Sequence, residues 1–165
     1  MEDLRRALSL VRVISIEHVG STAVPGLAAK PILDIDIIVQ RDQVACAVHA
    51  LSDAGYIHRG DLGVPDREAF HAPAGGPARN VYVCVEGTLH LRNHLAVRSV
   101  LRSHPDLRDA YGEVKLALAA EPAMTTERYV AGKSAILQAV LDRSDLSPDE
   151  KLAILQLNVN CAQGS

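Results

Sequence analysis

Apolar and polar residues alternate along short segments of the first half of the chain, whereas apolar residues recur at helical spacing through the second half. Alternation predicts strands at 12–18, 33–39 and 80–86 and a short strand at 56–58, and the Gly- and Pro-rich stretch 60–79 is expected as an irregular loop. Helical spacing predicts helices near residues 4–11, 42–54, 89–103, 106–120, 125–142 and 148–160. We therefore expect one α+β domain over residues 1–165, in which a mixed, helix-flanked β-sheet half (1–87) precedes a helical half (88–165).

Two carboxylates, Asp34 and Asp36, share one face of the predicted strand 33–39 with Ile38, and Ile35, Ile37 and Val39 face the other way. Paired carboxylates are hard oxygen ligands suited to Mg²⁺ or Mn²⁺. Upstream, Gly20-Ser21 form a turn that opens a short helix and would offer backbone N–H groups and a hydroxyl to a phosphate. Lys30 follows the turn and would add a cation. The alternative interpretation is an ordinary turn beside aspartates at a solvated sheet edge.

Composition narrows the partners of such a site. Aromatic residues make up 3% of the chain, which argues against base stacking and leaves the phosphates as the part of a nucleotide to be held. Lys and Arg number 17 against 20 Asp and Glu, so the net charge is 17 − 20 = −3, and no basic face for nucleic acid is expected.

The chain also lacks the sequence features of exported and membrane proteins. Its first residues are charged, and no apolar run reaches the ~18 residues of a membrane helix. The three cysteines, Cys46, Cys84 and Cys161, lack disulfide or metal spacing, and Cys46 and Cys84 are expected as small core residues. We therefore expect a cytoplasmic protein without membrane contact.

The stretch from Ile16 to Asp36, which reads IEHVGSTAVPGLAAKPILDID, resembles the signature of the GrpB family, a branch of the polymerase-β-like nucleotidyltransferase superfamily. Further matches follow in the second half of the chain: HLAVR at 94–98, LRSHP at 101–105, Tyr111 with Lys115, and Tyr129 with Lys133. The resemblance implies a nucleotidyltransferase-like fold, in which the Gly-Ser turn contacts the phosphates of a nucleotide and the paired aspartates bind divalent metal.

Superfamily transferases normally add a third carboxylate from a neighbouring strand, but that strand reads NVYVC at 80–84 in this chain. Glu86, on the same face of the strand, is expected to take this place. Asp61 and Glu68, from the predicted loop, are the alternatives. His18, just before the turn, is expected to orient the turn rather than to bind metal.

Cations recur at helical spacing in the second half of the chain. Arg98 and Arg102 form one stripe with His94, and the family resemblance directs this stripe toward phosphate. Lys115 and Lys133 lie on otherwise apolar helices. The alternatives are a solvated, ion-paired helix face for the arginines and snorkelling from the core for the lysines.

These observations predict a Mg²⁺- or Mn²⁺-dependent enzyme that binds a nucleoside triphosphate and transfers a nucleotidyl group to a small polar acceptor. The predicted catalytic residues are Asp34, Asp36 and Glu86, of which the two aspartates bind the metal. The predicted phosphate-binding residues are Gly20, Ser21, Thr22, Lys30, Arg98, Arg102, Lys115 and Lys133. The alternative is a nucleotide- or metabolite-binding module on the same fold without transfer activity.

Overall fold

The computed structural model describes the backbone of residues 1–163 and the side chains of residues 1–125 and 128–156. The chain divides into two compact units, one formed by Met1–Ala23 with Lys30–Leu91 and the other by Val24–Ala29 with Arg92–Ser165. The short segment Val24–Ala29 thus belongs to the second unit although both of its sequence neighbours belong to the first. Among the described residues, no helix is long and apolar enough to cross a membrane.

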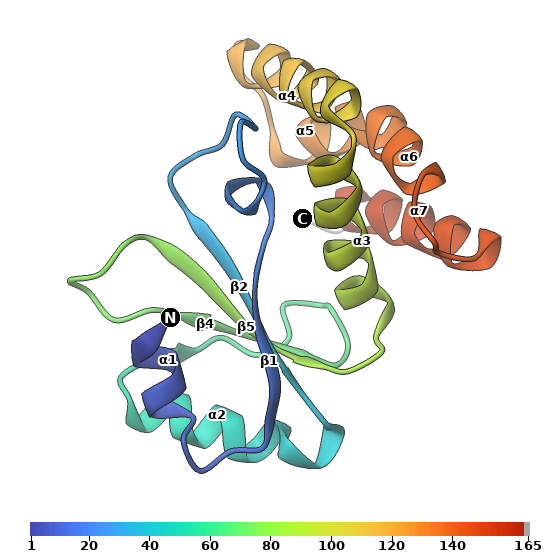
Figure 1. The fold of residues 1–165 in the computed structure, drawn as a ribbon. Helices are drawn as coiled ribbons and strands as arrows, with labels where there is room; N and C mark the ends of the chain where they lie inside the picture. The colour runs from blue at the N-terminus through green and yellow to red at the C-terminus, as the bar shows by residue number, and fades with distance from the viewer. Residues whose placement is uncertain (164–165) are drawn as a thin grey trace. The chain divides into compact units, whose positions relative to one another are not determined.

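The first unit is built on a five-stranded mixed sheet of order β1-β2-β5-β4-β3 (Figure 1). Its strands are β1 (Val13–Val19), β2 (Leu33–Val39), β3 (Ile57–His58), β4 (Arg67–His71) and β5 (Arg79–Val85). Strands β2 and β5 run parallel, whereas the other neighbours are antiparallel. A 3-10 helix, η1 (Ser21–Ala23), follows β1. The expected α+β class with a mixed sheet is confirmed.

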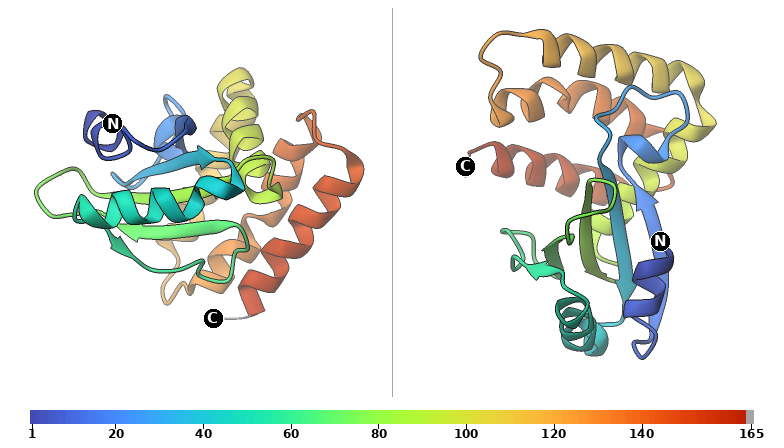
Figure 2. Two further views of the ribbon diagram at one scale, coloured as in Figure 1. Left: turned by 90° about the horizontal axis from the view of Figure 1, so that it is seen from below. Right: turned by 90° about the vertical axis from the view of Figure 1, so that its left-hand side faces the viewer.

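One face of this sheet is apolar and is covered by helices. Helix α1 (Glu2–Ala7), the 3-10 helix η2 (Arg41–Gln43) and α2 (Val44–Asp53) belong to this layer, and the left view of Figure 2 shows α2 lying over the strands. The core of the unit contains Leu4, Leu8, Ile35, Ile37, Val39, Ala47, Leu51, Tyr56, Phe70, Val81 and Val83. Because the strands alternate, this packing leaves the other face to the polar residues of β2 and β5.

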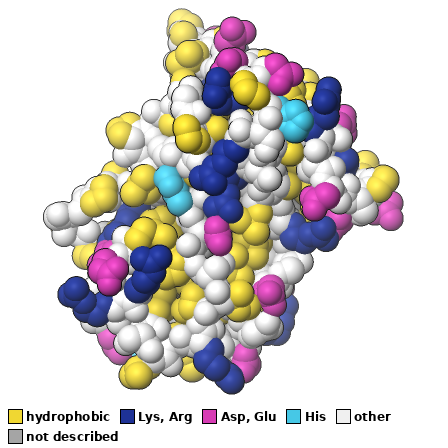
Figure 3. Space-filling model, in the orientation of Figure 1, with side chains coloured by type: hydrophobic (Ala, Val, Ile, Leu, Met, Phe, Trp, Pro, Cys, Tyr) yellow, Lys and Arg dark blue, Asp and Glu magenta, His cyan; other side chains and the backbone are white. Residues whose placement is uncertain are grey.

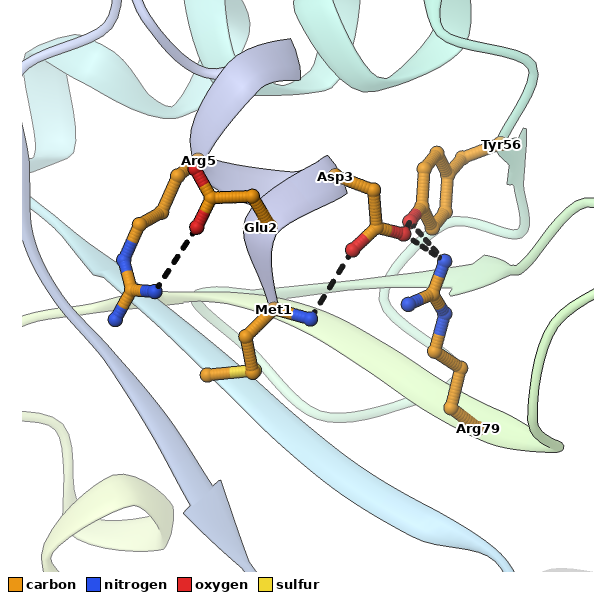
Figure 4. Close-up of polar contacts among 6 residues, drawn as sticks. All are labelled: Met1, Glu2, Asp3, Arg5, Tyr56 and Arg79. Carbon is orange, nitrogen blue, oxygen red and sulfur yellow. Dashed lines mark hydrogen bonds and ion pairs between the residues drawn. The ribbon is translucent and has the colours of Figure 1, made fainter.

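A polar network joins α1 to the sheet at the edge of this core (Figure 4). The Asp3 carboxylate forms an ion pair with Arg79 and accepts a hydrogen bond from the Tyr56 hydroxyl at 3.2 Å. Arg79 also donates to the Tyr56 hydroxyl oxygen at 2.6 Å, and only 8% of the Arg79 side chain is exposed. Hydrogen bonding by Arg79 holds the pKa of Asp3 well below its usual range. The network is therefore an anchor for the first helix.

The second unit is helical. It contains most of α3 (Leu89–Ser103) together with α4 (Pro105–Ala120), α5 (Thr126–Gly132), α6 (Ser134–Asp142) and α7 (Pro148–Gln163). Its core contains Val24, Leu27, Val100, Leu101, Tyr111 and Val140. At the start of α7, Ser147 and Glu150 exchange side chain to backbone hydrogen bonds, as a capping box requires.

Three local expectations were wrong. The predicted loop 60–79 contains β4, because Ala69 and Phe70 are buried against β5, a long-range pairing that local composition does not reveal. The predicted helix 125–142 is two helices that meet at Lys133, directly after Gly132, a poor helix former. Cys46 is exposed, although Cys84 is buried as expected. The side chain of Cys161 lies outside the described residues.

Candidate functional site

The turn after β1 is built around a close approach between Gly20 and Asp34. Gly20 has φ +69°, and a Cβ placed on it would collide with the Oδ2 of Asp34 and lie 3.1 Å from its Cβ and Cγ. Only glycine combines this left-handed backbone with the missing side chain. The start of η1 is therefore held directly against the first carboxylate of β2.

A chain of hydrogen bonds secures the same turn. The Thr22 hydroxyl donates to the carbonyl oxygen of Ile32 at 3.1 Å, and His18 Nε2 lies 2.9 Å from the hydroxyl oxygen. Because the single hydroxyl proton is used toward Ile32, His18 Nε2 must be the donor of the second bond. The expectation that His18 orients the turn is confirmed, and Thr22 acts here through its hydroxyl as part of the scaffold.

The sheet register gathers polar side chains on the face opposite the helices. Asp34 is paired with Asn80, and Asp36 with Tyr82, across the parallel β2–β5 ladder. The Asn80 amide donates to Asp34 Oδ1 at 2.8 Å. Asp36 is fully buried. The two aspartates thus have different surroundings, since Asp34 is partly exposed beside the turn and Asp36 lies deeper in the sheet.

Cys84 lies farther along the same face and is a thiol at neutral pH. Burial, and then the nearby Asp36 carboxylate, raises the pKa of Cys84 well above its usual range. Burial is also the main cause that raises the pKa of Tyr82, with Asp34 and Asp36 acting in the same direction and Arg67 opposing them. A reactive thiolate needs a lowered pKa, so Cys84 has the wrong environment for a nucleophile.

Glu17 is a third carboxylate on this face, and sequence reasoning missed it. The antiparallel β1–β2 ladder pairs Glu17 directly with Asp36 and Val19 with Asp34. Like charges directly opposite one another destabilise a sheet, so the pairing of Glu17 with Asp36 does not contribute to the stability of the fold. The available signal was an acidic residue within an alternating strand that leads into the Gly-Ser turn. The register that brings it to Asp36 was not readable locally.

Glu86 does not join the aspartates. It follows the end of β5, and its carboxylate accepts a hydrogen bond from Gln40 at 2.6 Å. Four residues of strand separate it from Tyr82, the partner of Asp36, which is roughly 13 Å at 3.3 Å per residue. The two loop alternatives are also engaged elsewhere: Asp61 accepts from the Gly63 N–H at 2.9 Å, and Glu68 contacts His58 at 2.6 Å.

The predicted cations divide between the two units. Lys30 belongs to the first unit and is exposed. Arg98 and Arg102 on α3, Lys115 on α4 and Lys133 between α5 and α6 all belong to the second unit. Their role as phosphate ligands stays a prediction.

The two lysines of the second unit have defined surroundings. Lys115 donates to the carbonyl oxygen of Ala28 at 2.8 Å, which fastens the Val24–Ala29 segment to α4. Lys133 lies 4.6 Å from the centroid of the Tyr129 ring, and burial lowers its pKa. Both ammonium groups thus contact protein atoms of their own unit.

Two further observations bear on ligands. Within residues whose side chains the structure describes, no three His, Cys, Asp or Glu side chains are arranged to hold a metal ion. On the face drawn in Figure 3, basic and acidic side chains are interspersed. Asp34 and Asp36 on β2, with Glu17 opposite Asp36 on β1, define the acidic face of the sheet.

The fold and these residues define an α+β protein in which a glycine-serine turn is packed against an acidic strand of a mixed sheet. The family described as "GrpB protein" matches residues 1–143, and the chain belongs to this family.

Its relatives agree with this assignment. A UPF0157 protein of Streptomyces coelicolor is 38% identical over 138 residues, which cover 79% of this chain and 69% of that protein. The UPF0157 protein YqkA of Bacillus subtilis is 32% identical over 122 residues, and this match spans 73% of our chain but only 36% of that longer protein. A crystal structure of the conserved protein GrpB from Enterococcus faecalis is similar with a TM-score of 0.71 and 29% identity, covering 86% of this chain and 88% of that one.

Proposed function

We propose that this protein binds a nucleoside triphosphate with Mg²⁺ or Mn²⁺ at the acidic sheet face and transfers a nucleotidyl group to a small polar acceptor. The observation that carries the proposal is the packing of the Gly20 turn against Asp34, with Asp36 next on the same face. This arrangement supports the proposal because a turn that would bind phosphate and a carboxylate that would bind metal are in contact within one unit.

The donor set suits a metal that arrives with its substrate. Mg²⁺ is commonly held by one or two carboxylates together with substrate phosphates and water, rather than by a complete protein cage. Asp34 and Asp36 would hold the metal, which when bound neutralises charge on the phosphates. Asn80 supports this role because its amide fixes the orientation of the Asp34 carboxylate.

The turn would hold the phosphates. The N–H groups at the start of η1 would donate to phosphate oxygens together with the Ser21 hydroxyl, while Gly20 lets the turn pack against Asp34. Lys30, exposed after the turn, would add a positive charge. Thr22 supports the turn through its bonds to Ile32 and His18.

Transfer requires that one proton leave the acceptor. The acceptor hydroxyl oxygen would form a bond to the α-phosphorus, the bond from that phosphorus to the bridging oxygen would break, and pyrophosphate would leave with the electron pair. Glu17, opposite Asp36, would take the hydroxyl proton on its carboxylate. Because no three described carboxylates are arranged as a metal site, proton acceptance suits Glu17 better than metal ligation.

Binding and transfer are tested separately. Calorimetric titration with ATP, CTP, GTP and UTP, each with Mg²⁺, should show binding that is lost in Asp34→Asn and in Asp36→Asn. Asp42→Asn is the matched control, since Asp42 is an exposed acid of the same unit that pairs with Arg12. Loss of one metal ligand should weaken binding about tenfold or more.

Release of pyrophosphate with a panel of small hydroxy and amino compounds tests transfer. Metal-dependent release that disappears in both aspartate variants supports the enzyme. Binding without release from any compound would favour the alternative of a binding module without transfer. No binding of any nucleotide, or binding equal in the aspartate variants and the control, contradicts the proposal.

A further inference from the structure

Arg67 is a cation on the acidic sheet face that no part of the proposed mechanism uses. It lies on β4, within the stretch that the sequence presented as a loop. The β4–β5 ladder pairs Arg67 with Cys84 and Ala69 with Tyr82, so Arg67 shares the face of Asp34 and Asp36. Strands β2 and β4 flank β5, so Arg67 lies two strand spacings, roughly 10 Å, across the sheet from β2 and two residues, roughly 7 Å, along the strands from the level of Asp36.

The guanidinium of Arg67 is held in place by a ring rather than by an acid. Its central carbon lies 4.8 Å from the centroid of Tyr82, the strand partner of Asp36. Arg67 is half-buried, and its Nη2 has only a long bond, 3.4 Å, to the carbonyl oxygen of Asp61. Stacking on an aromatic face fixes the plane of a guanidinium and leaves its N–H groups at the rim of the ring.

The charge of Arg67 lacks an acidic counterpart in the described part of the chain. The neighbouring Asp66 is engaged by Arg41, whose Nη2 donates to it at 2.7 Å. The Nε of Arg67 is buried and has no hydrogen-bond partner among the described residues. A buried donor without an acceptor costs free energy, and a half-buried guanidinium without a carboxylate does so too. An anionic ligand on this face, bound through the Nη groups, would supply the missing counter-charge.

We infer that Arg67 binds the phosphate chain of a polyphosphate ligand that runs across Tyr82 toward Asp34 and Asp36. A guanidinium suits phosphate because its fork of donors matches two phosphate oxygens. The span from β4 to β2 favours a chain of several phosphates over a single one. That the polyphosphate belongs to a nucleoside triphosphate rests on the proposed function. The binding of polyphosphate by Arg67 does not rest on the proposed function.

The probe is inorganic tripolyphosphate with Mg²⁺, which neutralises part of its charge beside the carboxylates, titrated into the full chain by calorimetry. Loss of charge-assisted bonds in Arg67→Gln should weaken binding about tenfold. Arg12→Gln, which removes an equally positive but exposed residue of the same unit, should bind like the unaltered chain. Equal affinity of Arg67→Gln and the unaltered chain would overturn the inference, and so would an equal loss in both variants.

A second readout does not depend on the variant folding. In the unaltered chain, the ¹H–¹⁵N signal of the Arg67 Nε group should shift during the tripolyphosphate titration, and an unmoved signal would overturn the inference. A probe without a nucleoside separates the two proposals. If no nucleotide binds with Mg²⁺ but tripolyphosphate binds through Arg67, the proposed function fails and this inference stands. If nucleotides bind with Mg²⁺ and Arg67→Gln changes neither titration, the proposed function stands and this inference fails.

Discussion

Gly20 and Asp34 are in such close contact that no side chain fits between them: a Cβ on Gly20 would overlap Oδ2 of Asp34. Gly20→Ala should therefore displace the carboxylate in addition to straining the backbone, which has φ +69°. We expect a stability loss of about 1–2 kcal/mol from the left-handed conformation and a loss of metal-dependent nucleotide binding. Chemical denaturation and calorimetry measure the two effects.

Gly60→Ala is the matched control for this substitution. Gly60 has φ +72°, close to that of Gly20, but a Cβ there would meet nothing within 4 Å. Both variants should lose stability through backbone strain, Gly20→Ala more than Gly60→Ala because of the overlap with Asp34, and only Gly20→Ala should lose binding. Equal nucleotide binding in the two variants would show that the contact with Asp34 has no functional role.

Glu17 is the third carboxylate that the structure offers, and Glu86 is the one that the sequence suggested. Glu17→Gln should lower the transfer rate by about 10²-fold or more, the usual contribution of a general base, while nucleotide affinity falls little. Glu86→Gln should leave the rate unchanged, because Glu86 lies beyond the end of β5 and bonds to Gln40. Single-turnover measurement of pyrophosphate release, with calorimetry for affinity, distinguishes the roles. A slow Glu86→Gln and a normal Glu17→Gln would reverse the assignment.

The anchor between Asp3 and Arg79 predicts the acid stability of the first unit. Arg79 lowers the pKa of Asp3 in the folded state, so the folded state binds the Asp3 proton less tightly than the unfolded chain does. The resulting stability is present above the unfolded pKa of about 3.9 and is lost as the pH falls through the lower folded value. Urea unfolding between pH 2 and 6 should show this slope, and Asp3→Asn should flatten it. An unchanged slope in Asp3→Asn would contradict the prediction.

Tyr111 predicts the opposite dependence at alkaline pH. Burial raises the pKa of Tyr111 to about 12, whereas a tyrosine in the unfolded chain titrates near 10. The unfolded state therefore releases its proton first, and stability falls as the pH rises from about 10 to 12. The two-unit difference corresponds to about 3 kcal/mol at most. Tyr111→Phe should lose less stability than the unaltered chain over this range, measured by urea unfolding at each pH. Parallel losses in both proteins would argue against a buried, protonated Tyr111.

Much of the local structure followed from the sequence because its causes are local. The alternation at 33–39 placed both aspartates on one face, as β2 confirms. Ser147 and Glu150 marked the start of α7 three residues apart, and the cap forms between them. The Gly-Ser turn was also visible, since glycine and the residues that follow it restrict the backbone without help from distant segments.

The composition of the acidic face was decided by strand pairing. Glu17 meets Asp36 because β1 and β2 run antiparallel in one particular register, and a shift of a single residue would turn Glu17 to the other face. Arg67 reaches this face because β4 pairs with β5 across a segment that reads locally as a loop. Glu86 was predicted on the correct face but lies beyond the strand that would carry it to the aspartates.

The sequence by itself therefore determined most of the helices and strands, the turn, the two aspartates and the family to which the chain belongs. Only the tertiary structure decided which further side chains stand beside them, because hydrogen-bond register between distant strands follows from packing of the whole sheet rather than from local propensity. The contact of Gly20 with Asp34, the pairing of Glu17 with Asp36 and the stacking of Arg67 on Tyr82 all belong to this second group.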